Sequence, residues 1–372
     1  MGNHRLSPAD ARRVAVRAQL LASPRPTDLM DVLRHLTSVQ LDPTAAIAPS
    51  ADLVLWSRVG SAYDPRSLRE ALEEQRVVEL SGVLRPMADL PLFRAEMAQW
   101  GGPEAAGWQR ARAAWVADNR ACRLDVLERL RADGPLLSRE LPDTCVRPWR
   151  STGWTHHKNM TQMLELLALM GVVAIAGRGG AGGGPGRERL WDLAERVYPD
   201  EPAVPLDEAL RRRGIRRLAA LGIARANGAA QQVEPVDVGA AGEEAVVDGV
   251  RGTWRVDPIL LDTAVEGRVA LLSPFDRLIH DRRRMSELFG FDYALEMFKP
   301  AATRRWGFYA LPVLVGDELV GKLDASANRA AGALRVTALH LDRELTPGDL
   351  DAVEEQIDDL ARWLELEVVR ER

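Results

Sequence analysis

The feature that most constrains the fold is an order of short elements between residues 134 and 193. A short capped helix is expected at 134–141 and an apolar helix at 159–170, followed by Gly171. Strands at 172–175 and 188–193 then enclose a glycine-rich stretch. Helix, turn, helix and a two-stranded wing is the order of the winged-helix motif. The sequence therefore predicts a winged-helix module here.

The same order recurs twice elsewhere in the chain. A helix at 206–221 is followed by Ile223-Ala224 and by expected strands at 231–236 and 252–256. Near the N-terminus, two capped helices lead into a turn and a third helix, which also has helix-turn-helix character. Three such modules in tandem are therefore predicted.

After residue 261 the pattern changes to strands. They are expected at 269–272, 305–315, 319–325 and 333–341, before an amphipathic helix that Thr346 and Pro347 begin. The predicted fold class is α+β, with three winged-helix modules and a β-barrel-like C-terminal domain. The predicted domains are residues 1–100, 101–204, 205–262 and 263–372.

Composition narrows the possible functions. The formal net charge of −5 argues weakly against a simple basic nucleic-acid binder, although arginines gather in several clusters. No apolar run approaches the roughly 18 to 20 residues needed to cross a bilayer, and no apolar signal core follows the N-terminus. We expect a cytoplasmic protein that binds no membrane. Cys122 and Cys145 lack zinc-type spacing with the six histidines, so two free thiols, no metal and no cofactor are expected.

One short stretch could carry chemistry. In Gln40-Leu41-Asp42-Pro43, the proline pushes Asp42 into an extended backbone. Gln40 and Asp42 are two residues apart, so in an extended segment an amide and a carboxylate project from one face. Taken alone, such an Asp-Pro pair is more often a loop entry with a turn-forming aspartate.

Other basic stretches have two readings. The glycine-rich tip lacks the Gly-Lys-Ser/Thr ending of a phosphate-binding loop, so it is either a wing tip on a DNA backbone or a loop without contacts. His156-His157-Lys158 is a phosphate contact or a solvated helix end. His280, followed by Asp281 and three arginines, is a general base or part of a basic surface.

Several linked motifs resemble one known family, the winged-helix DNA glycosylases of the azinomycin-resistance (AlkZ) and YcaQ type. The resemblance covers almost the whole chain. Its motifs are Ser38-Val39-Gln40-Leu41-Asp42-Pro43, Leu53-Val54-Leu55-Trp56-Ser57-Arg58, Leu271-Leu272-Ser273-Pro274-Phe275-Asp276-Arg277-Leu278, Leu288-Phe289-Gly290-Phe291-Asp292-Tyr293 and Gly307-Phe308-Tyr309-Ala310-Leu311-Pro312-Val313-Leu314.

The resemblance implies a C-shaped clamp on duplex DNA that removes N7-alkylated purines and unhooks interstrand cross-links. It implies that Gln40 and Asp42 are the catalytic residues, and double-stranded DNA is the expected partner of a monomer. The residues predicted to contact DNA are Ser38, Arg58, Lys158, Arg178, Arg187, Arg304, Arg305, Lys322 and Arg329.

The sequence departs from the family pattern at two places. The azinomycin-resistance enzyme has glutamine where this chain has Asp42, which is similar to the broader YcaQ-like branch. The family usually has a lysine and an acid in place of Ser326 and Asn328. These differences argue against azinomycin specificity and for a weaker DNA contact near Ser326.

The residue types suggest a mechanism. An N7-alkylguanine is cationic, so its glycosidic bond is already weakened, and a carboxylate can position water and stabilise an oxocarbenium ion. No lysine lies beside Gln40 and Asp42 to form a Schiff base, so the predicted enzyme is monofunctional. The alternative is a non-catalytic winged-helix regulator of transcription.

Overall fold

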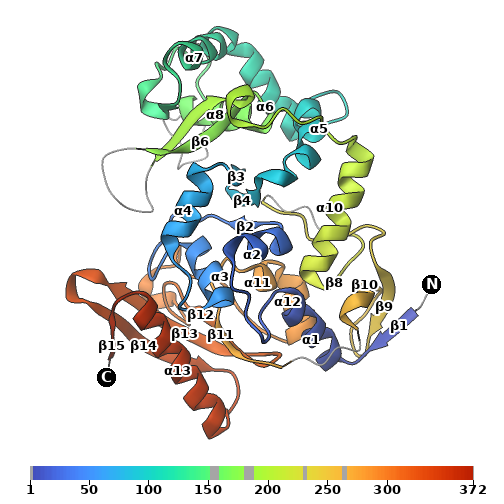
Figure 1. Ribbon diagram of the computed structural model, residues 1–372, viewed down its shortest axis with the longest axis vertical. Coiled ribbons are helices and arrows are strands. Elements are labelled where there is room, and N and C mark those ends of the chain that lie inside the picture. The colour runs from blue at the N-terminus through green and yellow to red at the C-terminus, as the bar shows by residue number, and fades with distance from the viewer. Residues whose placement is uncertain (1–2, 151–158, 180–187, 229–232, 262–265, 372) are drawn as a thin grey trace. The chain divides into compact units, whose positions relative to one another are not determined.

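The protein divides into two compact units, each with its own core. The computed structural model describes residues 3–150, 159–179, 188–228, 233–261 and 266–371 (Figure 1). Unit 1 contains residues 1–68 and 213–372, and unit 2 contains residues 69–212. Both mix helices with small antiparallel or mixed sheets, so the fold is α+β as predicted. Among the described residues, no helix is both long and apolar enough to cross a membrane.

Capped helices begin unit 1 where the sequence predicted them. The Ser7 side chain accepts a hydrogen bond from the Asp10 amide at the start of α1, and Asp28 caps α2 in the same way. Thr37 ends α2 in the left-handed conformation, at φ 61°. The helices are α1 (Pro8–Ala18), α2 (Leu29–Leu36), α3 (Ser50–Val59) and α4 (Pro65–Glu73), the last of which extends into unit 2.

A four-stranded sheet in unit 1 corrects one prediction. Its order is β1-β9-β10-β8, and β1 pairs parallel with β9. Residues 233–236 form no strand, because Glu234 turns inward to pair with Arg217. The strands are β1 (Asn3–Leu6), β8 (Ile223–Ala224), β9 (Glu243–Val247) and β10 (Trp254–Val256), and α10 (Leu206–Leu221) precedes them.

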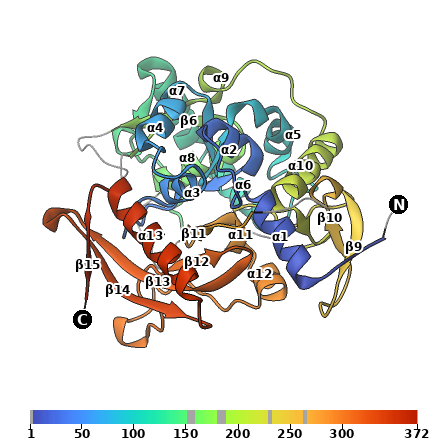
Figure 2. The same cartoon turned by 60° about the horizontal axis from the view of Figure 1, so that its bottom comes forward.

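The C-terminal part of unit 1 is a five-stranded sheet of order β11-β12-β13-β14-β15. The edge strands β11 and β15 do not pair with each other, so the sheet stays open. Helix α13 contacts β11, β12 and β15 (Figure 2). The strand predicted at 305–315 begins only at Leu311, since the preceding residues form an irregular loop. The elements are β11 (Val269–Leu271), α11 (Arg277–His280), α12 (Arg282–Phe289), β12 (Leu311–Val315), β13 (Glu318–Asn328), β14 (Ala333–Leu341), α13 (Pro347–Trp363) and β15 (Glu367–Arg370).

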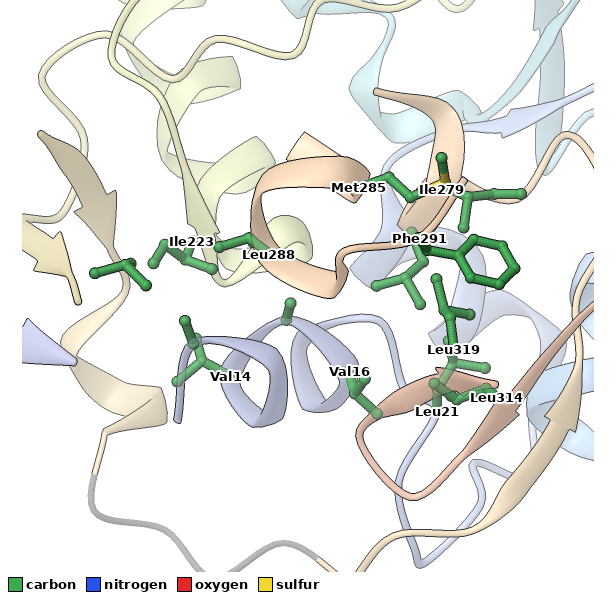
Figure 3. Packing of buried hydrophobic residues seen from close by; sticks show 14 of the residues in the cluster. Val14, Val16, Leu21, Ile223, Ile279, Met285, Leu288, Phe291, Leu314 and Leu319 are labelled. Carbon is green, nitrogen blue, oxygen red and sulfur yellow. The ribbon is translucent and has the colours of Figure 1, made fainter. Parts of the chain in front are cut away.

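A single apolar core joins parts of unit 1 that are distant in sequence. Val14 and Val16 of α1 pack in the same cluster as Ile223 of β8, Leu288 of α12 and Leu314 of β12 (Figure 3). This core includes residues from three of the four predicted domains, whose boundaries stay predictions. Burial of such side chains is the main favourable contribution to folding.

Unit 2 has the order of elements predicted for the second module. The helix expected across 102–133 is two helices that meet at Asn119, and the short helix expected at 134–141 is a two-residue strand with a single turn of 3-10 helix. The wing strands are present, whereas the tip at 180–187 lies outside the described residues. The elements are β3 (Val77–Leu80), β4 (Val83–Pro86), α5 (Pro91–Gln99), α6 (Gly107–Asp118), α7 (Arg120–Asp133), β5 (Leu136–Leu137), α8 (Asn159–Leu169), β6 (Val173–Gly179), β7 (Glu188–Leu193) and α9 (Ala194–Val197).

A fully buried ion pair connects α3 to the start of α11. Both terminal nitrogens of the Arg58 guanidinium, Nη1 and Nη2, donate to the Asp276 carboxylate, and Nε donates to the Gln19 carbonyl at 3.1 Å. Neither side chain is exposed to solvent. Removing one partner from such a pair leaves a buried charge without compensation.

We expect Asp276→Asn to lower the free energy of unfolding by about 3 to 5 kcal/mol. Asparagine can still accept from the Leu278 amide, which Asp276 Oδ1 binds at 2.9 Å, so the helix cap is retained. The matched control is Asp248→Asn, which disrupts the exposed pair with Arg5 and should change stability by less than about 1 kcal/mol. Urea unfolding followed by tryptophan fluorescence measures both, and equal effects would contradict the assigned role.

Candidate active site

Gln40 and Asp42 lie on an extended segment between α2 and α3. Strand β2 (Val39–Gln40) begins two residues after the left-handed Thr37, and the segment remains irregular from Leu41 to Pro49. Both side chains are half-buried. The short extended stretch predicted before Pro43 is therefore present.

The Ser50 side chain fixes the backbone of this segment. Its hydroxyl donates to the Gln40 carbonyl at 2.8 Å and accepts from the Asp42 amide at 2.8 Å. Ser50 is fully buried at the first position of α3. One side chain thus joins the backbone groups of both candidate catalytic residues to a helix, and we call this arrangement the Ser50 clasp.

The Asp42 carboxylate has one oxygen held and one available. Oδ1 accepts from the Thr44 amide at 2.9 Å. Within the described residues, Oδ2 has no hydrogen-bond partner, and neither does the side-chain amide of Gln40. A carboxylate oriented through one oxygen can accept a proton or orient water through the other.

A polar network supports the segment from the N-terminal side. Arg277 Nη1 donates to Ser38 Oγ at 2.6 Å, and Arg277 Nη2 lies 3.6 Å from Glu234 Oε1. Glu234 also pairs with Arg217 at 3.3 Å. All four side chains are largely buried. Ser38, predicted to contact DNA, is thus occupied by Arg277 in this structure.

Residues of the C-terminal part of unit 1 enclose the other side. Thr44 Oγ1 lies 3.6 Å from the sulfur of Met297, and the Ala327 amide donates to the Ala46 carbonyl at 2.8 Å. The segment that carries Gln40 and Asp42 is therefore held against β13 and the loop that contains Met297.

Tyr309 is a buried neighbour of Asp42. Burial raises the pKa of its hydroxyl, nearby Ser273 lowers it, and the Asp42 carboxylate raises it. The Tyr309 hydroxyl is buried and forms no hydrogen bond to any described residue, so Ser273 is a neighbour and not a hydrogen-bond partner. The raised pKa keeps Tyr309 neutral at physiological pH.

In the described part of the chain, His280 makes no hydrogen bond to Gln40 or Asp42, although Arg277 and Glu234 of the polar network lie near enough to act on its charge. Burial lowers the pKa of its imidazole, and Arg277 and Arg282 lower it further. The ring is therefore neutral near pH 7. The basic surface suggested for this stretch is incomplete, because Arg284 is buried and donates to the Leu221 and Ile223 carbonyls.

Two residues predicted to contact DNA have structural roles instead. Arg58 is fully buried against Asp276. Lys322 is almost fully buried: its ammonium binds Asp342 at 2.5 Å and lies 4.0 Å from the centre of the Phe291 ring. The sequence could not indicate either burial, because the partners are distant in the chain.

The other predicted DNA contacts differ in their surroundings. Arg305 and Arg329 are exposed in unit 1, and Arg304 is half-buried. Arg178 of the wing is bound to the buried Glu79 at 2.5 Å, and Arg189 binds the same carboxylate. Lys158 and Arg187 lie outside the described residues. These contacts stay predictions.

One group of side chains could in principle hold a metal. Cys122, Asp143 and Cys145 place their ligand atoms within 4.8 Å of one another, and the two sulfurs are 3.1 Å apart. The Asp143 oxygens already accept from Asn159 and from the Cys145 amide. Burial raises the pKa of the Cys145 thiol, and Cys122 adds to this effect, so the thiolate that a metal requires is disfavoured.

Comparison with known proteins assigns the chain to a family. Residues 33–363 match the family described as DNA glycosylase AlkZ-like. The chain belongs to the AlkZ-like DNA glycosylases. The solved structure of Streptomyces sahachiroi DNA glycosylase AlkZ is similar in fold, with a TM-score of 0.64 and 19% sequence identity over 99% of this chain and 100% of that chain. The protein is therefore a DNA glycosylase.

Sequence reasoning missed several residues that surround Gln40 and Asp42 in this glycosylase. Ser50 is an ordinary residue at a helix start, and nothing in its neighbourhood indicates that its hydroxyl points back across eight residues to Asp42. Thr44 carries no local signal for a site either, and Arg277 and Tyr309 stand in the family motifs but were given no role in the site.

We expect Ser50→Ala to slow base release by about a hundredfold, because loss of the clasp displaces Gln40 and Asp42. Ser57→Ala is the matched control: Ser57 is also buried in α3, but its hydroxyl donates to the Val54 carbonyl and accepts from Arg58 instead of bonding to Gln40 or Asp42. The measurement is the single-turnover rate of base release from methylated DNA. DNA affinity and melting temperature are measured for each variant beside it. A rate loss equal to that of Ser57→Ala would refute the role of the clasp.

Proposed function

We propose that the protein is a monofunctional DNA glycosylase that hydrolyses the N-glycosidic bond of N7-alkylated purines. Its substrates would include bulky adducts and interstrand cross-links, in DNA repair or in self-resistance to a genotoxin. The observation that carries this proposal is the Asp42 carboxylate, which is oriented through Oδ1 and has Oδ2 available for a water molecule.

The chemistry follows from the charge of the substrate. An N7-alkylpurine leaves as a neutral base from a cationic precursor, so no strong acid is needed to protonate it. In the proposed step, Asp42 accepts a proton from water as the water attacks the anomeric carbon, and its negative charge stabilises the oxocarbenium-like transition state. The side-chain amide of Gln40 would orient the water or the sugar.

The lysines support hydrolysis without strand cleavage. The chain has three lysines, and a lyase step would need a free amine at the sugar. Lys299 pairs with Glu296 and Lys322 with Asp342, while Lys158 lies outside the described residues. Of the two described lysines, neither has a free ammonium beside Asp42.

Duplex DNA is the proposed partner of a cytoplasmic monomer. Exposed Arg305 and Arg329 and half-buried Arg304 supply positive charge on unit 1, and the wing of unit 2 carries Arg178 and Arg189, which share one carboxylate partner, Glu79. Arginine contacts to phosphates would position the duplex without reading its sequence.

The alternative is a non-catalytic winged-helix regulator. It would bind one preferred sequence, and its footprint would be unaffected by Gln40→Ala. Sequence preference distinguishes the two functions, because both predict an affinity that falls steeply with salt.

We expect Asp42→Asn to reduce the rate of base release by about a thousandfold without changing DNA affinity, because it removes the base and the charge but retains the shape. The substrates are duplexes with one N7-methylguanine or one N7-linked interstrand cross-link. Strand breaks should appear only after alkali treatment. If the wild-type protein binds these duplexes and leaves all of them intact, the proposed substrate class is wrong.

A further inference from the structure

An exposed aromatic side chain lies on the loop next to the catalytic segment. Phe298 is 82% exposed, in the turn that follows Met297. Met297 itself contacts Thr44, two residues after Asp42. Single exposed apolar residues are common on protein surfaces, so the surroundings of Phe298 decide its meaning.

The loop that carries Phe298 is held rigidly from within. The buried Glu296 carboxylate accepts from the Arg305 and Trp306 amides at 2.7 and 2.8 Å and from the Lys299 ammonium at 2.8 Å. Arg304 Nε also donates to the Lys299 carbonyl at 3.0 Å. These bonds close residues 296–306 into a fixed loop.

The base of the loop is anchored by stacked side chains. Trp306 is buried, stacks on Tyr293 at 6.2 Å, and has the Lys322 ammonium 4.9 Å from its ring. The Tyr293 hydroxyl donates to the Ala310 carbonyl at 2.8 Å. The loop therefore presents Phe298 in a defined position, which limits the conformational entropy that binding would cost.

Three cations lie on the same loop as the exposed ring, of which Lys299 pairs with Glu296 and Arg305 with Asp292. Lys299 follows Phe298 directly, and Arg304 and Arg305 lie on the return side of the same loop. All three reach solvent. A rigid aromatic group among exposed cations has the chemistry that inserts into a base stack while phosphates are contacted on either side.

We propose that Phe298 is a wedge that inserts into the base stack of duplex DNA at the lesion and opens the glycosidic bond to Asp42. This inference rests on the proposed function, because it requires a damaged duplex at the catalytic segment. Partial unstacking beside the lesion would expose the anomeric carbon even when a cross-linked base cannot swing out of the helix.

The test uses the full-length protein and a duplex with a tetrahydrofuran abasic-site analogue beside 2-aminopurine, whose fluorescence rises when it unstacks. Wild type and Phe298→Trp should raise the fluorescence. Phe298→Ala should abolish the rise and weaken binding by about tenfold. Ile259→Ala is the matched control, because Ile259 is 81% exposed but lies in the short 3-10 turn after β10; it should behave as wild type.

The outcomes separate this inference from the proposed function. If Phe298→Ala binds, unstacks and releases base as wild type does, the wedge is refuted while the glycosylase substrate stands. If wild type releases no base but the fluorescence rise depends on Phe298, the wedge stands and the proposed substrate class falls. A change in sedimentation of Phe298→Ala with unchanged DNA behaviour would assign the ring to self-association and also refute the wedge.

Discussion

Helix α3 is fixed at both ends, and the candidate active site depends on this constraint. At its end, Arg58 forms a fully buried ion pair with Asp276, more than 200 residues away in the chain. At its start, Ser50 binds the backbone of Gln40 and Asp42. The ion pair therefore holds the helix in the unit 1 core, and the helix in turn holds the catalytic segment. A buried ion pair is often no more stabilising than apolar packing of the same volume. Here the pair fixes the position of helix α3 relative to the start of α11.

The segment that carries Gln40 and Asp42 lies between two N-terminal helices, and residues of the C-terminal part of unit 1 contact its other side. Met297, Tyr309 and Ala327 all lie more than 250 residues after Thr44 and contact or influence the segment. Residues from the two ends of the chain also share one apolar core. The fold also brings the loop that carries Phe298 into contact with Thr44 through Met297.

Local signals predicted helices better than strands. Ser7, Asp28 and Thr346 each cap a helix as expected, because a cap is made within one turn of the chain. Strands depend on partners. A strand is expected at 231–236, but its described residues 233–236 form none, and Glu234 pairs with Arg217. Strands β1 and β15, which pair in parallel with β9 and β14, were not predicted. The strand expected from residue 305 begins at Leu311, because Glu296 binds the backbone of Arg305 and Trp306.

The sequence by itself determined the family, because the linked motifs occur in order. It also indicated Gln40 and Asp42 as the candidate site, because Pro43 restricts the backbone before it. Only the tertiary structure decided which cations are available. Arg58 and Lys322 are buried against Asp276 and Asp342, while Arg305 and Arg329 stay exposed. It also decided that Ser50 orients the catalytic backbone and that Phe298 faces solvent. The reason is physical: backbone preferences act between neighbours in the chain, whereas burial and ion pairing are set by residues that meet only after folding.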